Sequence, residues 1–376
     1  MNKTRVAGIA GATYIAMLST LRPGSMSAGV SAKRRFAKFK TGNCFCKQNG
    51  ATTDANSHIY PKGDWICPGP NRNVSTWRPS DERCAAGSLG ITPASACDAL
   101  LQFGEVLFAG DSISRQFFQG LLVLLTGDWQ SGSLWNATLG DHNYQWNNTN
   151  WHRWWPAGGE RRNSNPLCQG RVEQFAEGCR MNVVLDTTRL ERICGGRLKM
   201  RFWHSWCSAA GFDPLLSVAI RNLAPNSLVV TNTGMHPGFS PAVMTNWLSP
   251  ILGRAPPGTH VVWHANDPPG AKKPEHFRKT QGRDALRAAL RDNVEWIARL
   301  RSQFPRQALD LIGFWNMTDK ANTQCAGDAT IPSTDGTHYP LSVNVEKARW
   351  LMLLIKEKCA ETRLQNRVLN ASLSMS

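Results

Sequence analysis

The chain has 376 residues, with 43 Lys and Arg against 27 Asp and Glu, and a formal net charge of +16. This length allows a full hydrophobic core, and the alternation of apolar and amphipathic segments excludes disorder for most of the chain. The charge favours an acidic partner such as a uronic-acid polymer, nucleic acid or an anionic membrane, unless dispersed arginine only aids solubility. Nucleic acid is disfavoured, because the basic residues form no aromatic-interleaved reading surface.

The first 53 residues contain no Asp or Glu and include a mildly apolar stretch from Val6 to Leu21. Small and polar residues interrupt this stretch, which is long for a signal core and marginal for a membrane span. We expect residues 1–43 to be a targeting or anchor segment with a stem. A membrane-bound signal anchor, a cleaved signal and an organellar transit peptide all remain open.

Eleven cysteines include no Cys-x-x-Cys pair, which disfavours zinc. Many cysteines together with several glycosylation sequons favour the secretory pathway, where disulfides form. The sequons begin at Asn2, Asn73, Asn136, Asn147, Asn316 and Asn370. The odd number of cysteines leaves at least one thiol unpaired within a monomer.

Residues 44–98 are loop-rich and carry five of the cysteines. They predict a small disulfide-tied cap, followed by a main domain over 99–360 and a flexible tail over 361–376. In the main domain, a helix with one apolar face follows the strand at 105–110. Further strands are expected at 181–185, 199–206, 228–232, 260–264 and 309–314, and the clearest later helices at 283–303 and 341–358.

Apolar strands joined by helical crossovers predict an α/β fold, a three-layer α/β/α sandwich with a mostly parallel sheet. A polar insertion over 129–166 is rich in tryptophan, whose flat apolar face and single donor suit sugar rings. We expect one or two of these side chains to contact glycan and the others to anchor the insertion. They are Trp129, Trp135, Trp146, Trp151, Trp154 and Trp155.

The segment Gly110-Asp111-Ser112 places one hydroxyl on a tight turn from a strand into a helix. A serine there lies beside helix N-terminal amides that favour negative charge, and it needs only a base to become a nucleophile. Asp335-x-x-His338 supplies a carboxylate and an imidazole just before the last helix, and two distant loops at one end of a parallel sheet can meet. The alternative is that all three residues cap helices and turns.

With these motifs and Asn232-Thr-Gly234 after a central strand, the chain resembles the trichome birefringence-like and PC-esterase branch of the SGNH hydrolases. Trp77-Arg-Pro, Gly-Asp-Ser112-x-Ser-Arg115 and Asp335-Gly-Thr-His338-Tyr follow that family's order over about residues 65–359. The last motif is closer to the wider PC-esterase group than to the plant members, so the acceptor is not carried over.

The resemblance implies O-acetyl transfer to a polysaccharide or glycan in the Golgi lumen, through a Ser112-His338-Asp335 triad. A secreted or organellar location is the alternative. Asn232, helped by Arg115 and Gly234, is expected to serve the oxyanion and the substrate. The alternative for Arg115 is an ordinary surface position, and the alternative for Asn232 is a residue that merely ends the strand. We expect His236 to be a packed residue at a strand end.

We expect Asp111 to hold the turn through backbone hydrogen bonds. Neither a metal nor a bound organic cofactor is expected, and the acetyl donor, acetyl-CoA or another acetylated molecule, is left open. The expected partners are that donor and an oligosaccharide or polysaccharide acceptor, for which the positive charge suggests an acidic one. Two other functions stay open: a carbohydrate O-acetyl esterase, and a noncatalytic glycan-binding or cell-wall protein.

Overall fold

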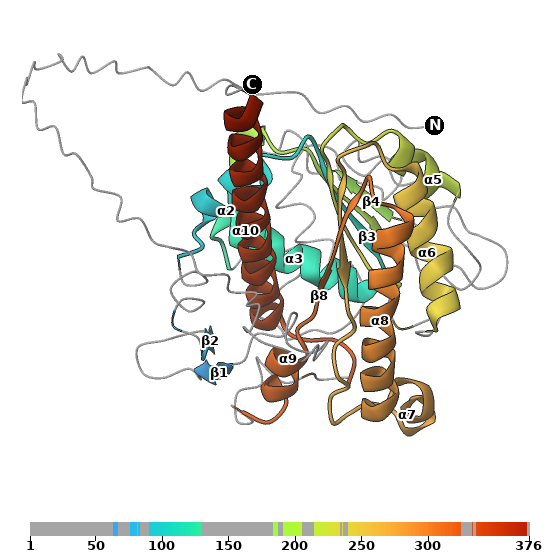
Figure 1. Cartoon of the computed structure of the whole chain (residues 1–376). Coiled ribbons are helices and arrows are strands. Elements are labelled where there is room, and N and C mark those ends of the chain that lie inside the picture. The colour runs from blue at the N-terminus through green and yellow to red at the C-terminus, as the bar shows by residue number, and fades with distance from the viewer. Residues whose placement is uncertain are drawn as a thin grey trace, which may run out of the picture. The chain divides into compact units, whose positions relative to one another are not determined.

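A mostly parallel β-sheet organises the part of the chain that the computed structural model describes (Figure 1). The described residues are 63–66, 76–80, 82, 90–129, 183–186, 191–204, 214–233, 235, 240–324, 333 and 336–373, all within the unit Thr41–Ser376. Among them the sheet has six strands in the order β4-β5-β3-β6-β7-β8, and only β4 runs antiparallel to its neighbour. These strands are β3 (Val106–Gly110), β4 (Val183–Asp186), β5 (Met200–His204), β6 (Leu228–Thr231), β7 (His260–His264) and β8 (Ala308–Ile312).

Helices cover both faces of the sheet (Figure 1). Val106 and Phe108 of β3 pack with α2, α3 and α10 on one face, and Leu107 and Ala109 pack with α5, α6 and α8 on the other. A strand buried on both faces must be apolar throughout, which explains why β3 reads Val-Leu-Phe-Ala-Gly. The helices are α2 (Pro93–Leu100), α3 (Ser112–Thr126), α5 (Pro214–Arg221), α6 (Pro241–Arg254), α8 (Arg283–Gln303) and α10 (Leu341–Leu373).

The predicted α/β fold with a mostly parallel sheet is therefore confirmed, and its layers are compatible with a three-layer sandwich. The helix predicted over 283–303 has the same bounds in α8. The last helix, however, does not end near 358: α10 continues to Leu373, so most of the segment expected as a flexible tail is helical. None of the described helices combines the length and the apolar character that crossing a membrane would require.

The range predicted as a loop-rich cap contains regular structure. Strands β1 (Gly63–Ile66) and β2 (Thr76–Pro79) pair antiparallel, and α2 packs into the main core. The indole of Trp65 donates a 2.8 Å hydrogen bond to the carbonyl of Met317 in α9 (Trp315–Ala321). Cys44, Cys46, Cys67 and Cys84 lie outside the described residues, so the disulfide-tied cap stays a prediction.

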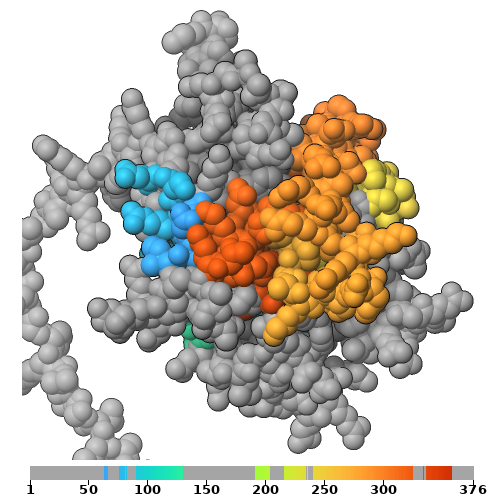
Figure 2. Space-filling model, turned by 90° about the horizontal axis from the view of Figure 1, so that it is seen from below, coloured from blue at the N-terminus to red at the C-terminus, as the bar shows by residue number. Residues whose placement is uncertain are grey.

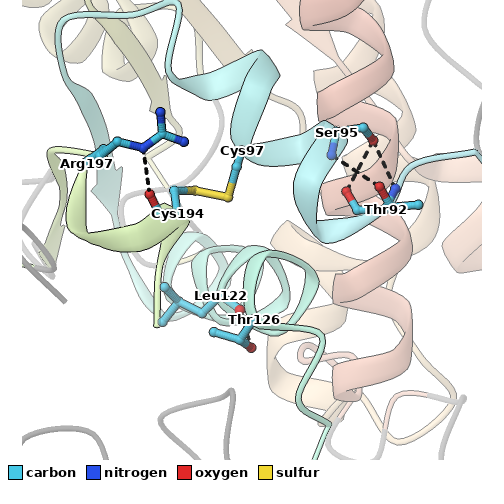
Figure 3. Close-up of a disulfide and its surroundings, with 7 residues drawn as sticks. All are labelled: Thr92, Ser95, Cys97, Leu122, Thr126, Cys194 and Arg197. Carbon is cyan, nitrogen blue, oxygen red and sulfur yellow. Dashed lines mark hydrogen bonds between the residues drawn. A yellow bond between two sulfur atoms is a disulfide. The ribbon is translucent and has the colours of Figure 1, made fainter. Parts of the chain in front are cut away.

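A disulfide between Cys97 and Cys194 joins α2 to the short 3-10 helix η2 (Cys194–Gly196) (Figure 3). It links the predicted cap range to the main domain across 97 residues of sequence. Helix α2 begins with a capping box, in which the side chains of Thr92 and Ser95 each accept a hydrogen bond from the other's backbone amide. The disulfide therefore fixes α2 to η2, and the capping box stabilises the first turn of α2.

Helix α10 packs closely along α3 because Gly120 has no side chain. A Cβ atom at this position would lie 2.2 Å from the backbone oxygen of Asn344. The backbones of the two helices can approach this closely only with glycine here. Since residues 336–340 lead directly into α10, this packing also places the segment that carries His338.

Candidate active site

Ser112 is the first residue of α3, and only Asp111 separates it from the central strand β3. The Asp111 side chain caps the helix by accepting a 2.9 Å hydrogen bond from the backbone amide of Ile113. Gly110 has a φ of +153°, and a Cβ atom there would lie 2.3 Å from Ser114 Oγ, so only glycine fits the turn. Ser112 therefore lies beside first-turn amides that have no partner within the helix and that favour an anion.

Ser112 and His338 are hydrogen-bonded to each other. The distance between Ser112 Oγ and His338 Nε2 is 2.7 Å, although the residues are 226 positions apart in sequence. Both side chains are buried, with 5% and 6% of their surface exposed. When Nε2 carries no proton, it accepts a hydrogen bond from the serine hydroxyl and can remove the hydroxyl proton. A general base activates a nucleophile in this way.

Asn232 follows β6, the strand next to β3, and its amide group has a fixed orientation. Ser114 Oγ donates a 2.8 Å hydrogen bond to Asn232 Oδ1. The amide nitrogen Nδ2 is thereby directed away from Ser114; it is buried and has no hydrogen-bond partner among the described residues. An unsatisfied buried donor is costly, so a group in this position is a natural donor to an oxyanion.

The Asp111 carboxylate also connects the two loops that carry Ser112 and Asn232. Its Oδ2 accepts a 3.0 Å hydrogen bond from the backbone amide of Met235, while Oδ1 caps α3. The prediction that Asp111 holds the turn through backbone hydrogen bonds is confirmed. One carboxylate thus sets the distance between the candidate nucleophile and the candidate oxyanion donor.

The topology of the sheet explains why these residues meet. After β3 the chain forms the edge strand β4 and then β5 on one side of β3, and from β5 it crosses to β6 on the other side of β3. In open α/β sheets, ligands bind at such a switch point, outside the carboxyl ends of the strands. Ser112 and Asn232 follow the carboxyl ends of β3 and β6, and His338 reaches the same edge from the segment before α10.

Arg115 lies one helical turn beyond Ser112 with only 1% of its surface exposed. This burial excludes the alternative of an ordinary surface arginine, while a role toward substrate stays a prediction. Asp335, Gly234 and His236 lie outside the described residues, so the third triad member is not placed. Of the tryptophans in the predicted insertion, Trp129 is described and half-buried, and the others lie outside the described residues.

The loop after β7 supports the segment that carries His338, and this support was not predicted. The amide of Gly270 donates to the carbonyl of Gly336 at 3.1 Å, and Lys273 Nζ donates to Thr337 Oγ1 at 2.7 Å. On the other side of His338, the Tyr339 hydroxyl donates to the carbonyl of Pro268 at 2.9 Å. These contacts anchor the residues on both sides of the candidate base.

A buried ion pair joins this loop to α10. Lys347 Nζ donates to the Asp267 carboxylate, and the ammonium group lies 5.4 Å from the ring centre of Tyr339. Burial raises the pKa of Tyr339 well above its usual value, and the Asp267 charge adds to the shift. Burial lowers the pKa of His264 well below its usual value, and the Lys347 charge adds to that shift, so His264 is neutral.

The sequence contained a signal for this pair. Lys347 falls on the apolar stripe of α10 with Val343, Leu351 and Leu354, where an unpaired lysine would be costly. Such a position indicates a buried charge with a partner, but the pattern does not say which acid supplies it.

Among the described residues, no group of three or more His, Cys, Asp or Glu gathers as a metal site would require. The expectation about metals and cofactors stays a prediction.

Comparisons with protein-family models, with curated proteins and with solved structures find no match to this chain. The chemistry open to the site therefore follows from its own geometry. That geometry is a serine hydroxyl at a helix N-terminus, an imidazole in hydrogen-bond contact with it, and a buried amide donor after the neighbouring strand.

Proposed function

We propose that this protein is an O-acetyltransferase that modifies a polysaccharide or glycan through a serine acyl-enzyme. The observation that carries the proposal is the 2.7 Å hydrogen bond between Ser112 Oγ and His338 Nε2. A noncatalytic glycan-binding protein would have no need to keep a buried serine and histidine in this contact. Structural caps are satisfied locally, whereas these two residues come from opposite ends of the sheet domain.

In the first half-reaction, Ser112 Oγ attacks the acetyl carbonyl of the donor while His338 takes the hydroxyl proton. Asn232 Nδ2 and an amide of the first turn of α3 stabilise the oxyanion. The intermediate collapses, His338 returns the proton to the leaving group, and an acetyl ester of Ser112 remains. Asp335 is proposed to orient the imidazole and to stabilise its charged form.

In the second half-reaction, a hydroxyl group of the acceptor sugar attacks the acetyl-serine. His338 removes the proton of that hydroxyl and returns it to Ser112 Oγ as the new ester leaves. If water takes the place of the sugar, the same intermediate gives acetate, and the enzyme is an esterase. The two activities differ only in which hydroxyl reaches the acyl-enzyme.

We further propose that the chain belongs to the PC-esterase branch of the SGNH hydrolases. Its α/β fold, a nucleophile after the first strand of the main sheet and a histidine before the last helix support this assignment. The location that we propose is the Golgi lumen. The Cys97–Cys194 disulfide supports a compartment of the secretory pathway, since such bonds persist in oxidising compartments.

The test compares the full chain with its Ser112→Ala variant and with Ser302→Ala, a matched change at an exposed position of α8. Each is incubated with an activated acetyl ester and a panel of neutral and acidic oligosaccharides, and the products are weighed by mass spectrometry. We expect acetylated sugar from the wild type and Ser302→Ala, and a rate lower by about 1,000-fold or more for Ser112→Ala.

An acetyl group on the peptide containing Ser112 would identify the intermediate. Acetate without acetylated sugar, still dependent on Ser112, would assign the esterase reaction instead. Equal rates for the wild type and Ser112→Ala would refute the serine mechanism.

A further inference from the structure

A cavity of about 510 Å³ lies between the loop after β7 and the start of α8. Figure 2 views this face and shows the orange surface of residues 265–285 beside the deeper orange of α9. Helix α7 (Glu275–Gln281) supplies part of the wall. The lining residues are Pro269, Gly270, Ala271, Lys273, Arg278, Lys279, Gly282, Arg283, Asp284 and Ala285.

The lining of this pocket is strongly basic. Among the described residues, it has four cationic side chains, Lys273, Arg278, Lys279 and Arg283, against one carboxylate, Asp284. Arg283 forms an ion pair with Asp319 and Lys273 is bonded to Thr337, so the positive charge offered to a ligand comes mainly from the exposed Arg278 and Lys279. Like charges held around a concave surface repel each other, and an anion in the cavity relieves that repulsion.

The backbone adds to this positive potential. Helix α8 begins at the pocket, and Gly282 as its N-cap provides no side-chain acceptor for the first-turn amides. The positive end of the macrodipole of this long helix is therefore directed to the same place as the cationic side chains. Asp284, in the first turn of α8, offsets part of this effect.

Two residues that line the pocket also contact the segment just before His338. Lys273 lines the pocket and donates to Thr337, the residue before His338, while Gly270 donates to the carbonyl of Gly336. Lys273 is 4% exposed, whereas Arg278 and Lys279 are exposed. One loop therefore contacts the segment of the candidate base with one side and the pocket with the other.

We propose that this pocket binds an anionic group of the substrate that reacts at Ser112. The group is a carboxylate or a phosphate, from either an acidic acceptor sugar or a phosphorylated acetyl donor such as acetyl-CoA. The inference rests on the proposed function, because it names the chemistry of the substrate of that site. Exposed Lys279 supplies the most direct contact, and Lys273 connects occupancy of the pocket to the His338 segment.

The kinetic test uses Lys279→Glu and, as a matched control, Arg291→Glu at an exposed position of α8 that does not line the pocket. Turnover of neutral 4-nitrophenyl acetate is compared with acetyl transfer from acetyl-CoA and with acetylation of trigalacturonate. Lys279→Glu should raise the KM of an anionic substrate relative to that of the neutral ester by about tenfold, and Arg291→Glu should leave both unchanged.

A binding measurement separates this inference from the proposed reaction. Titration calorimetry on the Ser112→Ala protein should detect trigalacturonate or coenzyme A, with affinity about tenfold weaker when Lys279→Glu is added. Weakening for the sugar assigns the anion to the acceptor, and weakening for coenzyme A assigns it to the donor. If neither anion binds, or if Lys279→Glu behaves like Arg291→Glu with both, the pocket proposal is wrong.

A failure of the proposed function would give a different result from a failure of the pocket proposal. In that case turnover of the neutral ester would not depend on Ser112, while the titration would still decide whether the pocket takes an anion.

Discussion

At the scale of single residues, the candidate site depends on polar side chains that are buried and oriented by one another. Ser114 holds Asn232 by its amide oxygen, and Asp111 holds both the helix start and the amide of Met235. Such contacts remove the freedom of the amide to rotate before a substrate arrives. An oxyanion donor that needs no reorganisation is the most effective kind.

Replacing Asn232 by Ala should lower kcat on a neutral acetyl ester by about 100- to 1,000-fold with little change in KM, because the donor acts mainly in the transition state. Steady-state kinetics at saturating ester measures the effect. Ser114→Ala keeps the donor but frees its orientation, so its loss should be smaller. Full kcat in Asn232→Ala would exclude the oxyanion role.

At the scale of elements, the position of His338 depends on how α10 packs on α3. The contact at Gly120 and Asn344 is between backbones, so it cannot relax by rotation of a side chain. The Lys347–Asp267 pair fixes α10 to the loop after β7 as well. The candidate base is thus positioned by helix packing and by a buried ion pair rather than by its own segment alone.

Gly120→Ala should force α3 and α10 apart, lowering the free energy of unfolding by about 1–3 kcal/mol and reducing kcat through displacement of His338. Chemical denaturation and ester kinetics measure the two effects. Gly253→Ala, in α6, is the matched control, since its Cβ atom would meet Phe304 at an ordinary 3.6 Å. Equal stability of the two variants would contradict the packing argument.

The Cys97–Cys194 disulfide ties α2 to the strand layer through η2. It closes a loop of 97 residues, so the double variant Cys97→Ala, Cys194→Ala should lose about 4 kcal/mol of unfolding free energy. Denaturation of both proteins under oxidising conditions measures this. A variant as stable as the wild type would mean that the core alone holds α2.

At the scale of the whole molecule, ionisable groups are buried both within α10 and elsewhere in the core, and those with shifted pKa values make folding depend on pH. Burial raises the pKa of Glu346 from 4.5 to about 7, although Arg349 opposes the shift. The folded state therefore favours the protonated acid. This contribution to stability is present below pH 4.5 and is lost as the pH rises through 7.

Glu346→Gln should consequently become more stable relative to the wild type as the pH rises from 5 to 8, by about 3 kcal/mol at most. The lowered pKa of His264 has the opposite effect on the pH dependence of stability. Its contribution to the free energy of unfolding is lost as the pH falls below 6.5. The difference between variant and wild type, measured by denaturation at each pH, isolates Glu346. Glu295→Gln, at an exposed position of α8, is the control, and a pH-independent difference for Glu346→Gln would refute the assignment.

The fully buried strands and α8 could be predicted from the sequence because their signals are local. A continuous apolar run such as 228–230 and a helical apolar spacing such as that of 283–303 are each complete within one segment. The strands of the 44–98 range escaped prediction because β1 and β2 have only four residues each and are stabilised by partners such as α9 and α10. The end of α10 was also missed, although Leu364, Val368 and Ala371 continue a helical apolar spacing beyond residue 360.

Ser112, His338 and Asn232 could be selected because each follows a strand or precedes a helix in a recognisable motif. Asp267, Lys347 and Lys273 could not be paired in advance, since each finds its partner in a segment far away in the sequence. The same holds for the basic pocket, whose lining becomes a cavity only when the loop after β7 lies against the start of α8.

The sequence by itself determined the class of fold and the identity of the candidate nucleophile and base, because hydrophobic period and turn chemistry act between near neighbours in the chain. Only the tertiary structure decided that Ser112 and His338 lie 2.7 Å apart, that the Asn232 amide nitrogen has no hydrogen-bond partner within the described part of the chain, and that the cations gather around one cavity. Distances and burial depend on how distant segments pack, and packing depends on the whole chain at once.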